Sequence, residues 1–314
     1  MLERDPLQLT PLVETIAGDT SVGHAWAYCA AVEALTDCKL DDEVEFARAL
    51  MLELERVAMH LAALSGLAAD IAFLQGATTY GRLRTTAINA SMRLCGSRFG
   101  RSALRPGGVR LRPPESTLEG LFESLKLLQR DLEPMRDLFL SARTVQHRLK
   151  GVGVLSAQRA QELGMVGLAA RASDVAIDTR SAPRGGAYQL EPLAPVVHPD
   201  GDCWARACVR IGELEASLDW LERVIRRHAK WDQPRRAPGR LAPNQLAVTL
   251  IEGFRGEVMH CVETNDQGRL LHYKVQDPSL RNWMGLALAV RGNEISDFPI
   301  CNKSFDLSYC GHDL

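Results

Sequence analysis

Apolar residues recur at every third or fourth position along much of the chain, which is the spacing of amphipathic helices. Five segments follow this pattern and are predicted to be helices: 21–36, 41–68, 82–98, 115–150 and 202–230. Segment 21–36 is apolar nearly all round, so it is expected to be a buried helix. Pro134 predicts a kink in the fourth helix. The first four helices are expected to pack as a bundle.

The period changes in the last quarter of the chain. Alternating apolar positions on either side of 265–268, Asn-Asp-Gln-Gly, predict a β-hairpin over 251–276. Residues 104–109 contain Pro-Gly-Gly and predict a turn whose glycines permit positive φ. A last short helix is predicted at 283–291, and the Pro- and Arg-rich run 232–243 is predicted to be an exposed linker. The fold class is therefore mainly α (α+β), a long-helix bundle core with a small β-hairpin region.

Composition excludes several classes of protein. The formal charge is -2, with 37 basic and 39 acidic residues, so no basic field points to nucleic acid. No apolar run reaches the roughly 18 residues of a membrane span, and the N-terminus has no signal-like core. The 314 residues are predicted to form one domain in the cytoplasm or on a cytoplasmic membrane face. The eight cysteines are spread singly, which favours packing roles over disulfides or zinc sites.

Candidate chemistry begins in the stretch Glu14–Glu33. It resembles the first active-site motif of nickel–iron hydrogenase large subunits of the membrane-bound, complex I-related group, Glu-Arg-Ile-Cys-Gly-x-Cys-x-x-x-His. The residues that fit the motif and the helix after it are Glu14, Ile16, Gly18, His24, Ala27, Tyr28, Ala31, Val32 and Glu33. Ala17 and Thr20 stand at the two cysteine positions.

The C-terminal stretch Asp297–Cys310 resembles the family's terminal Asp-Pro-Cys-x-x-Cys segment. Leu307 replaces the first cysteine and Cys310 keeps the second. In the family, four thiolates hold nickel and iron, whereas an aliphatic side chain has no lone pair and a hydroxyl is a poor ligand for a soft metal. The resemblance with these changes implies that this chain binds no metal. Cys310 is then expected to be a small packing residue.

Further segments carry the same resemblance. Glu53–Leu61 resembles the Glu-Leu-x-Arg-Ile-x-x-His-Leu helix that these hydrogenases share with the 49 kDa-type subunit of complex I. Glu53, Arg56 and His60 share one helix face, which is either a solvated charged stripe or a buried proton path. The other segments that resemble the family are 104–109, 167–180 and 252–260.

The resemblance implies a set of candidate site residues: Glu14, Asp19, His24, His60, Arg255 and Cys310. In the family the arginine of segment 252–260 overhangs the metal, so Arg255 is expected to be a pocket cation, although Phe254 replaces the usual proline. The residues at the four cysteine positions, Ala17, Thr20, Leu307 and Cys310, are expected to lie close together below Arg255. Asp19 or Glu14 is expected to neutralise Arg255. His24 has two interpretations, a pocket group or a hydrogen-bonded core histidine.

The resemblance implies a metal-free, hydrogenase-large-subunit-like component of a membrane-associated, complex I-related redox or ion-pumping assembly. The implied partners are an iron–sulfur small subunit and antiporter-like membrane subunits, on the cytoplasmic face of the inner membrane. The family's N-terminal sheet-rich region is expected to be missing, since Met1 falls just after the place where a family loop should end.

Three alternatives remain. The chain resembles the 49 kDa-type, quinone-reducing subunit of NADH dehydrogenase and is a candidate for that role, but the tyrosine of that subunit's elbow aligns with Gly18 and its upstream His-Arg-Gly loop is absent. A purely structural subunit is the second alternative. A true nickel–iron hydrogenase is disfavoured by Ala17, Thr20 and Leu307.

Overall fold

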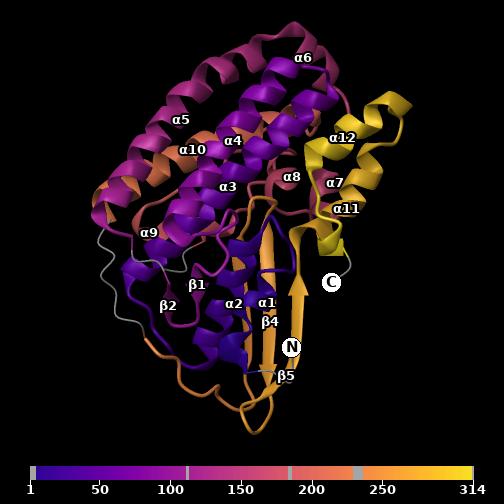
Figure 1. Cartoon of the computed structure of the whole chain (residues 1–314). Coiled ribbons are helices and arrows are strands. Elements are labelled where there is room, and N and C mark those ends of the chain that lie inside the picture. The colour runs from indigo at the N-terminus through magenta and orange to yellow at the C-terminus, as the bar shows by residue number, and fades with distance from the viewer. Residues whose placement is uncertain (1–4, 111–112, 183–185, 229–235, 313–314) are drawn as a thin grey trace.

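A bundle of long helices forms the largest part of the molecule (Figure 1). The computed structural model describes residues 5–110, 113–182, 186–228 and 236–312. The bundle helices are α3 (Asp42–Asp70), α4 (Leu74–Cys95), α5 (Glu115–Ser141) and α10 (Cys203–His228). Helix α3 packs against both α4 and α10, and α5 packs on α4 and α10.

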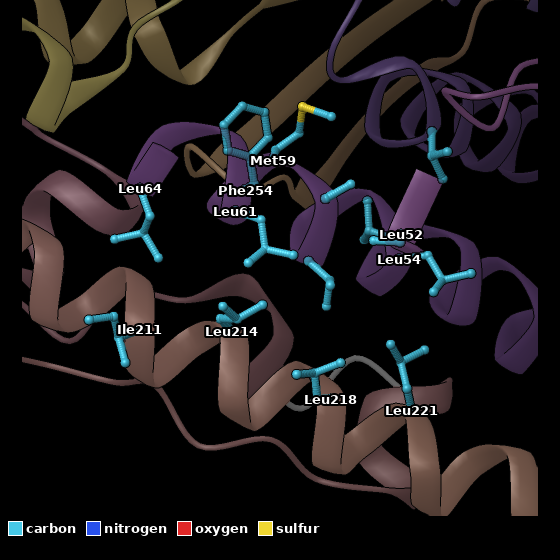
Figure 2. Close-up of a cluster of buried hydrophobic side chains, with 14 of the residues drawn as sticks. Leu52, Leu54, Met59, Leu61, Leu64, Ile211, Leu214, Leu218, Leu221 and Phe254 are labelled. Atoms are coloured by element: carbon cyan, nitrogen blue, oxygen red, sulfur yellow. The ribbon is translucent and has the colours of Figure 1, made fainter. Parts of the chain in front are cut away.

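Leucine side chains fill the interface between α3 and α10 (Figure 2). Leu214, Leu218 and Leu221 recur at spacings of four and three on α10, so they share one face. Leu54 and Leu61 of α3 lie opposite, and all five side chains are almost completely buried. Burial of each leucine contributes about 1.5–3 kcal/mol, so the contact between α3 and α10 is a main source of the bundle's stability.

Helix α5 runs through Pro134 without a break. The break comes at Ala142, whose backbone is extended (φ -67°, ψ 114°), and α6 (Arg143–Leu149) follows. The helical segment predicted at 115–150 is thus two helices, and the kink at Pro134 stays a prediction. Pro134 is exposed, so water can bond the carbonyl that loses its helical partner.

Helix α2 (Ser21–Leu35) packs on a sheet rather than in the bundle, so the expectation that it is a bundle helix is wrong and α10 takes that place. The sheet is antiparallel, in the order β3 (Leu246–Glu252), β4 (Glu257–Thr264) and β5 (Leu270–Gln276). The predicted hairpin is confirmed as β4 and β5. Strand β3 was not predicted, because its apolar residues run on instead of alternating.

The predicted turn at 104–109 joins β1 (Leu104–Arg105) to β2 (Gly108–Val109). Gly107 has φ +80°, and a Cβ there would lie 1.9 Å from the carbonyl oxygen of Arg236. Only glycine fits this position. The turn is held by Glu33, whose carboxylate accepts the Gly107 N–H at 2.7 Å and pairs with Arg48 at 2.6 Å.

The C-terminal part contains two helices, α11 (Pro278–Ala289) and α12 (Phe298–Phe305). Helix α11 starts earlier than predicted, because the Asp277 side chain caps it by accepting the Ser279 N–H at 2.8 Å. Helix α12 was not predicted. The predicted linker 232–243 lies partly outside the described residues, and 236–243 carry neither helix nor strand.

The short elements complete the description. They are η1 (Pro6–Gln8), α1 (Thr10–Val13), α7 (Ala157–Glu162), α8 (Gly167–Arg171), η2 (Thr179–Ser181), α9 (Ala187–Leu190), η3 (Ile295–Asp297) and η4 (Cys310–His312). Within the described ranges, every helix is too short or too polar to cross a membrane.

Candidate functional site

Arg255 lies where the turn before α2 (residues 15–20, called the elbow below) meets the C-terminal segment (residues 297–312). Its two terminal nitrogens donate to the carboxylate of Asp19 at 2.9 and 2.7 Å. Its Nε donates to the carbonyl oxygen of Asp306, and Nη1 also lies 3.5 Å from the hydroxyl of Thr20. One guanidinium therefore connects the elbow to the residue beside Leu307. The pairing partner is Asp19 rather than Glu14.

The Arg255 side chain is 6% exposed and the Asp19 side chain 37% exposed. Burial works against the charged guanidinium, but the Asp19 carboxylate outweighs it and holds the pKa of Arg255 above its ordinary value. The pair is thus a charged bridge at the rim of the elbow, with the cation on the inside and part of the carboxylate facing out.

Glu14 ties the elbow to another loop. Its Oε1 accepts the backbone N–H of Ser102 at 2.7 Å, and its carbonyl oxygen accepts the Ser21 hydroxyl at 3.1 Å. Burial raises the pKa of Glu14, while the Ser102 N–H and the guanidinium of Arg101 act in the opposite direction. Glu14 is therefore a buried carboxyl group with a raised pKa, close to the elbow but separate from Arg255.

Glu55, a residue of α3, caps the helix that follows the elbow. Its two oxygens accept the N–H groups of Val22 at 2.7 Å and Gly23 at 3.2 Å. Thr20 occupies the N-cap position without a side-chain cap bond, so the orphan donors of α2 are satisfied from a different helix. Burial outweighs these two donors and raises the pKa of Glu55 to about 8. Glu55 was not among the predicted site residues.

His24 is the middle of a hydrogen-bonded chain. Its Nδ1 lies 3.0 Å from Nε2 of His260, and its Nε2 lies 3.3 Å from Asp277. Nδ1 of His260 lies 2.8 Å from the hydroxyl of Tyr273. The histidines and Asp277 are fully buried, and Tyr273 is partly buried.

One proton arrangement satisfies all three bonds of this chain. Tyr273 donates to His260, His260 donates to His24, and His24 donates to Asp277. Burial, with His24 next to it, holds the pKa of His260 well below its ordinary value, so its ring is neutral. Burial acts to raise the pKa of Asp277, but His24 and the donors of Ser279 together outweigh it, so the pKa lies below its ordinary value and Asp277 is ionised. Every donor in the chain thus points toward one carboxylate.

His60 lies in a second buried polar group, and its ring meets that of Phe254 edge-on with the ring centroids 6.2 Å apart. Its Nε2 donates to Glu213 at 2.9 Å, because its Nδ1 faces the donor-only guanidinium of Arg210 at 3.4 Å. Burial lowers the pKa of His60 to about 4. His60 is therefore a neutral histidine with a fixed tautomer.

The charged groups around His60 form one ionic cluster with equal numbers of acids and arginines. Its members are Glu53, Arg56, Arg171, Asp178, Arg180, Arg210, Glu213 and Glu252. Arg171 joins Glu213 at 2.7 Å to Glu252 at 2.8 Å. Glu53 also accepts the hydroxyls of Ser217 at 2.6 Å and Tyr188 at 2.7 Å. The Glu53–Arg56–His60 face is therefore buried and paired, not a solvated stripe.

A cavity of about 290 Å³ reaches this cluster between α2, α3, α9 and β3. Trp26 and Tyr188, whose ring centroids are 6.4 Å apart, form its aromatic wall, and Arg180 and Glu252 of the cluster line it. The cavity gives a small molecule access to the edge of the ionic cluster.

The residues at the family's metal positions do not fit a nickel–iron centre. Ala17, Thr20 and Leu307 are buried and supply no thiolate, and Cys310 is exposed. The expectation that Cys310 is a packing residue is wrong. It sits in η4, where the chain turns back to the surface after the buried Ser308. Among the described residues, no three His, Cys, Asp or Glu side chains form a metal-binding group.

The fold matches that of a chain in a solved respiratory membrane complex. The chain superposes with TM-score 0.90 on a chain of the membrane-bound sulfane sulfur reductase, an archaeal respiratory membrane complex. The two are 22% identical, and the match covers 100% of this chain and 86% of the other.

Sequence relatives include both expected classes. The chain is 29% identical to the membrane-bound hydrogenase subunit alpha of Pyrococcus furiosus, over 97% of this chain and 75% of that protein. It is 27% identical to an NADH-quinone oxidoreductase subunit of Bacillus mycoides, over 92% and 80%. Residues 70–239 match the family of the 49 kDa subunit of the respiratory-chain NADH dehydrogenase. The chain belongs to that family, and the predicted relationship to hydrogenase large subunits and complex I is confirmed.

The sequence indicated several residues of the site but not the residues that hydrogen-bond to them. Glu55, His260 and Asp277 lie far from the elbow in sequence, and His24 and His260 are 236 positions apart. His260 lay within a segment that resembles the family, which was the available signal. Glu55 also lay within such a segment, but at a position that the family pattern leaves unspecified, and its role follows from the packing of α3 against the start of α2.

Proposed function

We propose that this chain is a subunit of a membrane-associated, complex I-related assembly, that it binds no nickel–iron centre, and that its buried polar chains conduct or store protons. The observation that carries the proposal is the Arg255–Asp19 bridge. Ala17 and Thr20 stand at two of the family's metal-ligand positions, and beside them Arg255 and Asp19 neutralise each other's charge. Such a pair keeps the pocket ordered without a cluster.

Each candidate residue receives a role that its contacts support. Asp19 and Arg255 position the elbow against the C-terminal segment. Glu55, whose pKa is raised to about 8, can take up or release a proton near neutral pH, and burial raises the pKa of Glu14 as well. His24 is the central relay of its chain, and His60 orients Glu213. Cys310, the one thiol kept from the family pattern, is given no proton-carrying role.

The proposed neighbours are an iron–sulfur small subunit, which carries the electrons, and antiporter-like membrane subunits, which carry the ion. The proposed location is peripheral, on the cytoplasmic face of the inner membrane. The names of the relatives support a membrane-complex setting: one is a membrane-bound hydrogenase and another an NADH-quinone oxidoreductase.

The test is to purify the complex from its native membrane through a tag on this chain and to measure nickel and iron by elemental analysis. The expected result is no stoichiometric nickel, with iron accounted for by a co-purified iron–sulfur subunit. About one nickel per chain would overturn the metal-free proposal. Recovery of the chain alone, with no redox subunit, would instead support a purely structural or unrelated role.

Quinone reduction is the second candidate function, because the family match is to the 49 kDa subunit of NADH dehydrogenase. Reduction of a short-chain quinone by the purified complex, with an inhibitor-sensitive rate, would favour it. Trp26→Ala would test whether the cavity contributes, since Trp26 forms its aromatic wall. An unchanged rate in that variant would place the quinone elsewhere.

A further inference from the structure

Two buried cysteines from distant parts of the chain lie side by side between α10 and α12. Cys203 is the first residue of α10 and Cys301 lies within α12. Both are fully buried, and neither is in a disulfide. Both sulfur atoms lie within 3.5 Å of one point, the place that a Cβ on Gly153 would occupy. The two sulfur atoms are therefore close neighbours.

The surroundings favour a thiolate at Cys203. Nη2 of Arg206 lies 3.4 Å from its sulfur, and the start of α10 adds the positive end of a helix dipole. The Cys301 thiol as donor, with Arg206 and Ser304 nearby, outweighs burial and lowers the pKa of Cys203 to about 6. The neighbouring sulfur of Cys203 and burial both raise the pKa of Cys301.

The neighbouring residues hold this arrangement in place. Arg206 donates to Ser304 at 2.8 Å and to the carbonyl oxygen of Gly153 at 2.9 Å, and its guanidinium lies over the ring of Phe305. Gly153 has φ +65°, and a side chain there would meet Cys301 at 2.5 Å. The absence of a side chain at Gly153 thus makes room for the two sulfurs.

We propose that Cys203 and Cys301 are a redox-sensitive dithiol, oxidised by peroxide to a disulfide that fixes α12 to the start of α10. The Cys203 thiolate attacks one peroxide oxygen, so an S–O bond forms, the O–O bond breaks and hydroxide leaves. The Cys301 thiol then attacks the sulfenic sulfur, so the S–S bond forms and the S–O bond breaks. Two thiols lose two electrons and two protons, and one hydrogen peroxide becomes two waters.

Oxidation at this place acts on the candidate site through the end of α12. Arg210 donates to the carbonyl oxygens of Ser304 and Phe305, both at 3.0 Å, and Arg255 donates to that of Asp306. A disulfide at Cys301 therefore restrains the segment that caps both arginines. Access of peroxide requires transient opening of α12, a two-turn helix that begins at the half-exposed Phe298.

The experiment treats the purified full chain with hydrogen peroxide, blocks remaining thiols with an alkylating agent, and maps non-reduced peptides by mass spectrometry. The expected product is a peptide pair linking Cys203 to Cys301, lighter by two hydrogens, reversed by dithiothreitol and more than tenfold above any other cysteine pair. Exposed Cys310 is the internal control for non-specific oxidation, since it is expected to be overoxidised rather than linked.

Two variants sharpen the outcome. In Cys301→Ser, sulfenic acid at Cys203 is expected to persist and to be trapped by a 1,3-dione, whereas Cys208→Ser, changed on the same helix, is expected to form the link like wild type. If Cys301→Ser does not fold, the peptide mapping of the wild-type protein still tests the proposal. Absence of the Cys203–Cys301 link in folded wild type, or its appearance only after the protein unfolds, overturns the proposal.

Discussion

At the scale of single residues, Arg255 does what a lysine could not. Its fork donates two hydrogen bonds to Asp19, and its Nε donates a third to the backbone of Asp306. An ammonium group has no fixed fork and cannot hold both partners in one plane. The guanidinium therefore fixes the relative position of the elbow and the C-terminal segment as well as neutralising Asp19.

Replacing Arg255 by Met is expected to destabilise the fold by about 2 kcal/mol, because it leaves Asp19 unpaired and a buried carbonyl without its donor. The loss stays below that of a fully buried pair, since Asp19 is 37% exposed and water can solvate it. Urea denaturation measures the change. Arg226→Met is the control, because that side chain is 60% exposed. Equal stability of the two variants would contradict a structural role for the bridge.

Glu55 is expected to make stability fall as pH rises. Its folded-state pKa is about 8 against an ordinary value of 4.5, so between these values the folded chain holds a proton that the unfolded chain has lost. Its contribution is fully present below the unfolded pKa and is lost as pH rises through the folded pKa. Urea denaturation from about pH 5 to about pH 9 is expected to show this slope in wild type and a flatter one in Glu55→Gln.

Over this pH range the free energy of unfolding of wild type is expected to fall by a few kcal/mol more than that of Glu55→Gln, at about 1.36 kcal/mol per unit of pKa difference. Glu215→Gln is the matched control, because that carboxylate is partly exposed and lies far from the elbow in the sequence. Parallel curves for wild type and Glu55→Gln would show that Glu55 is already ionised in the folded state.

At the scale of elements, one face of α10 carries a regular row of buried polar side chains. Arg206, Arg210, Glu213 and Ser217 follow at spacings of four, three and four, and all are at most 1% exposed. They face the C-terminal segment, His60 and Glu53 in turn. The helix thus aligns its polar groups as regularly as its leucines (Figure 2).

Glu213→Gln is expected to cost about 3–5 kcal/mol, because Arg171 and Arg56 would keep their charges with one carboxylate fewer in a dry interior. Glu215→Gln, two residues along the same helix, is expected to cost less than about 1 kcal/mol, since its pair with Arg136 is partly exposed. Chemical denaturation of both variants measures the contrast. Similar losses would mean that the cluster is better hydrated than its burial indicates.

The elements that the sequence predicted are those with a strong local period. Helix 21–36 was placed to within a residue because it is apolar nearly all round, and the hairpin because a turn sequence separates two alternating arms. Strand β3 and helix α12 lack such a period. The bridge of Arg255 to Asp19 was one of two pairings expected, the other being with Glu14, whereas the Glu55 cap and the Cys203–Cys301 pair depend on how distant elements pack.

At the scale of the whole molecule, both buried polar systems end at the C-terminal segment. Arg210 of the ionic cluster holds the carbonyl oxygens at the end of α12. Asp277, the acceptor of the histidine chain, lies against Gly311, where an added Cβ would sit 2.3 Å from its Oδ1. A displacement of the C-terminal segment would therefore alter contacts of both systems.

If the histidine chain conducts protons in the assembled complex, His260→Gln should separate proton movement from electron transfer. Glutamine can keep hydrogen bonds to His24 and Tyr273, but it cannot accept a proton on one atom and release it from another. Folding and electron transfer are expected to persist, while ions translocated per electron, measured in inverted membrane vesicles, fall severalfold. His272→Gln, a 68% exposed change on the same hairpin, is expected to leave the ratio unchanged. An unchanged ratio in His260→Gln would leave the histidine chain as a packing feature, and an equal fall in both variants would point to general damage to the hairpin.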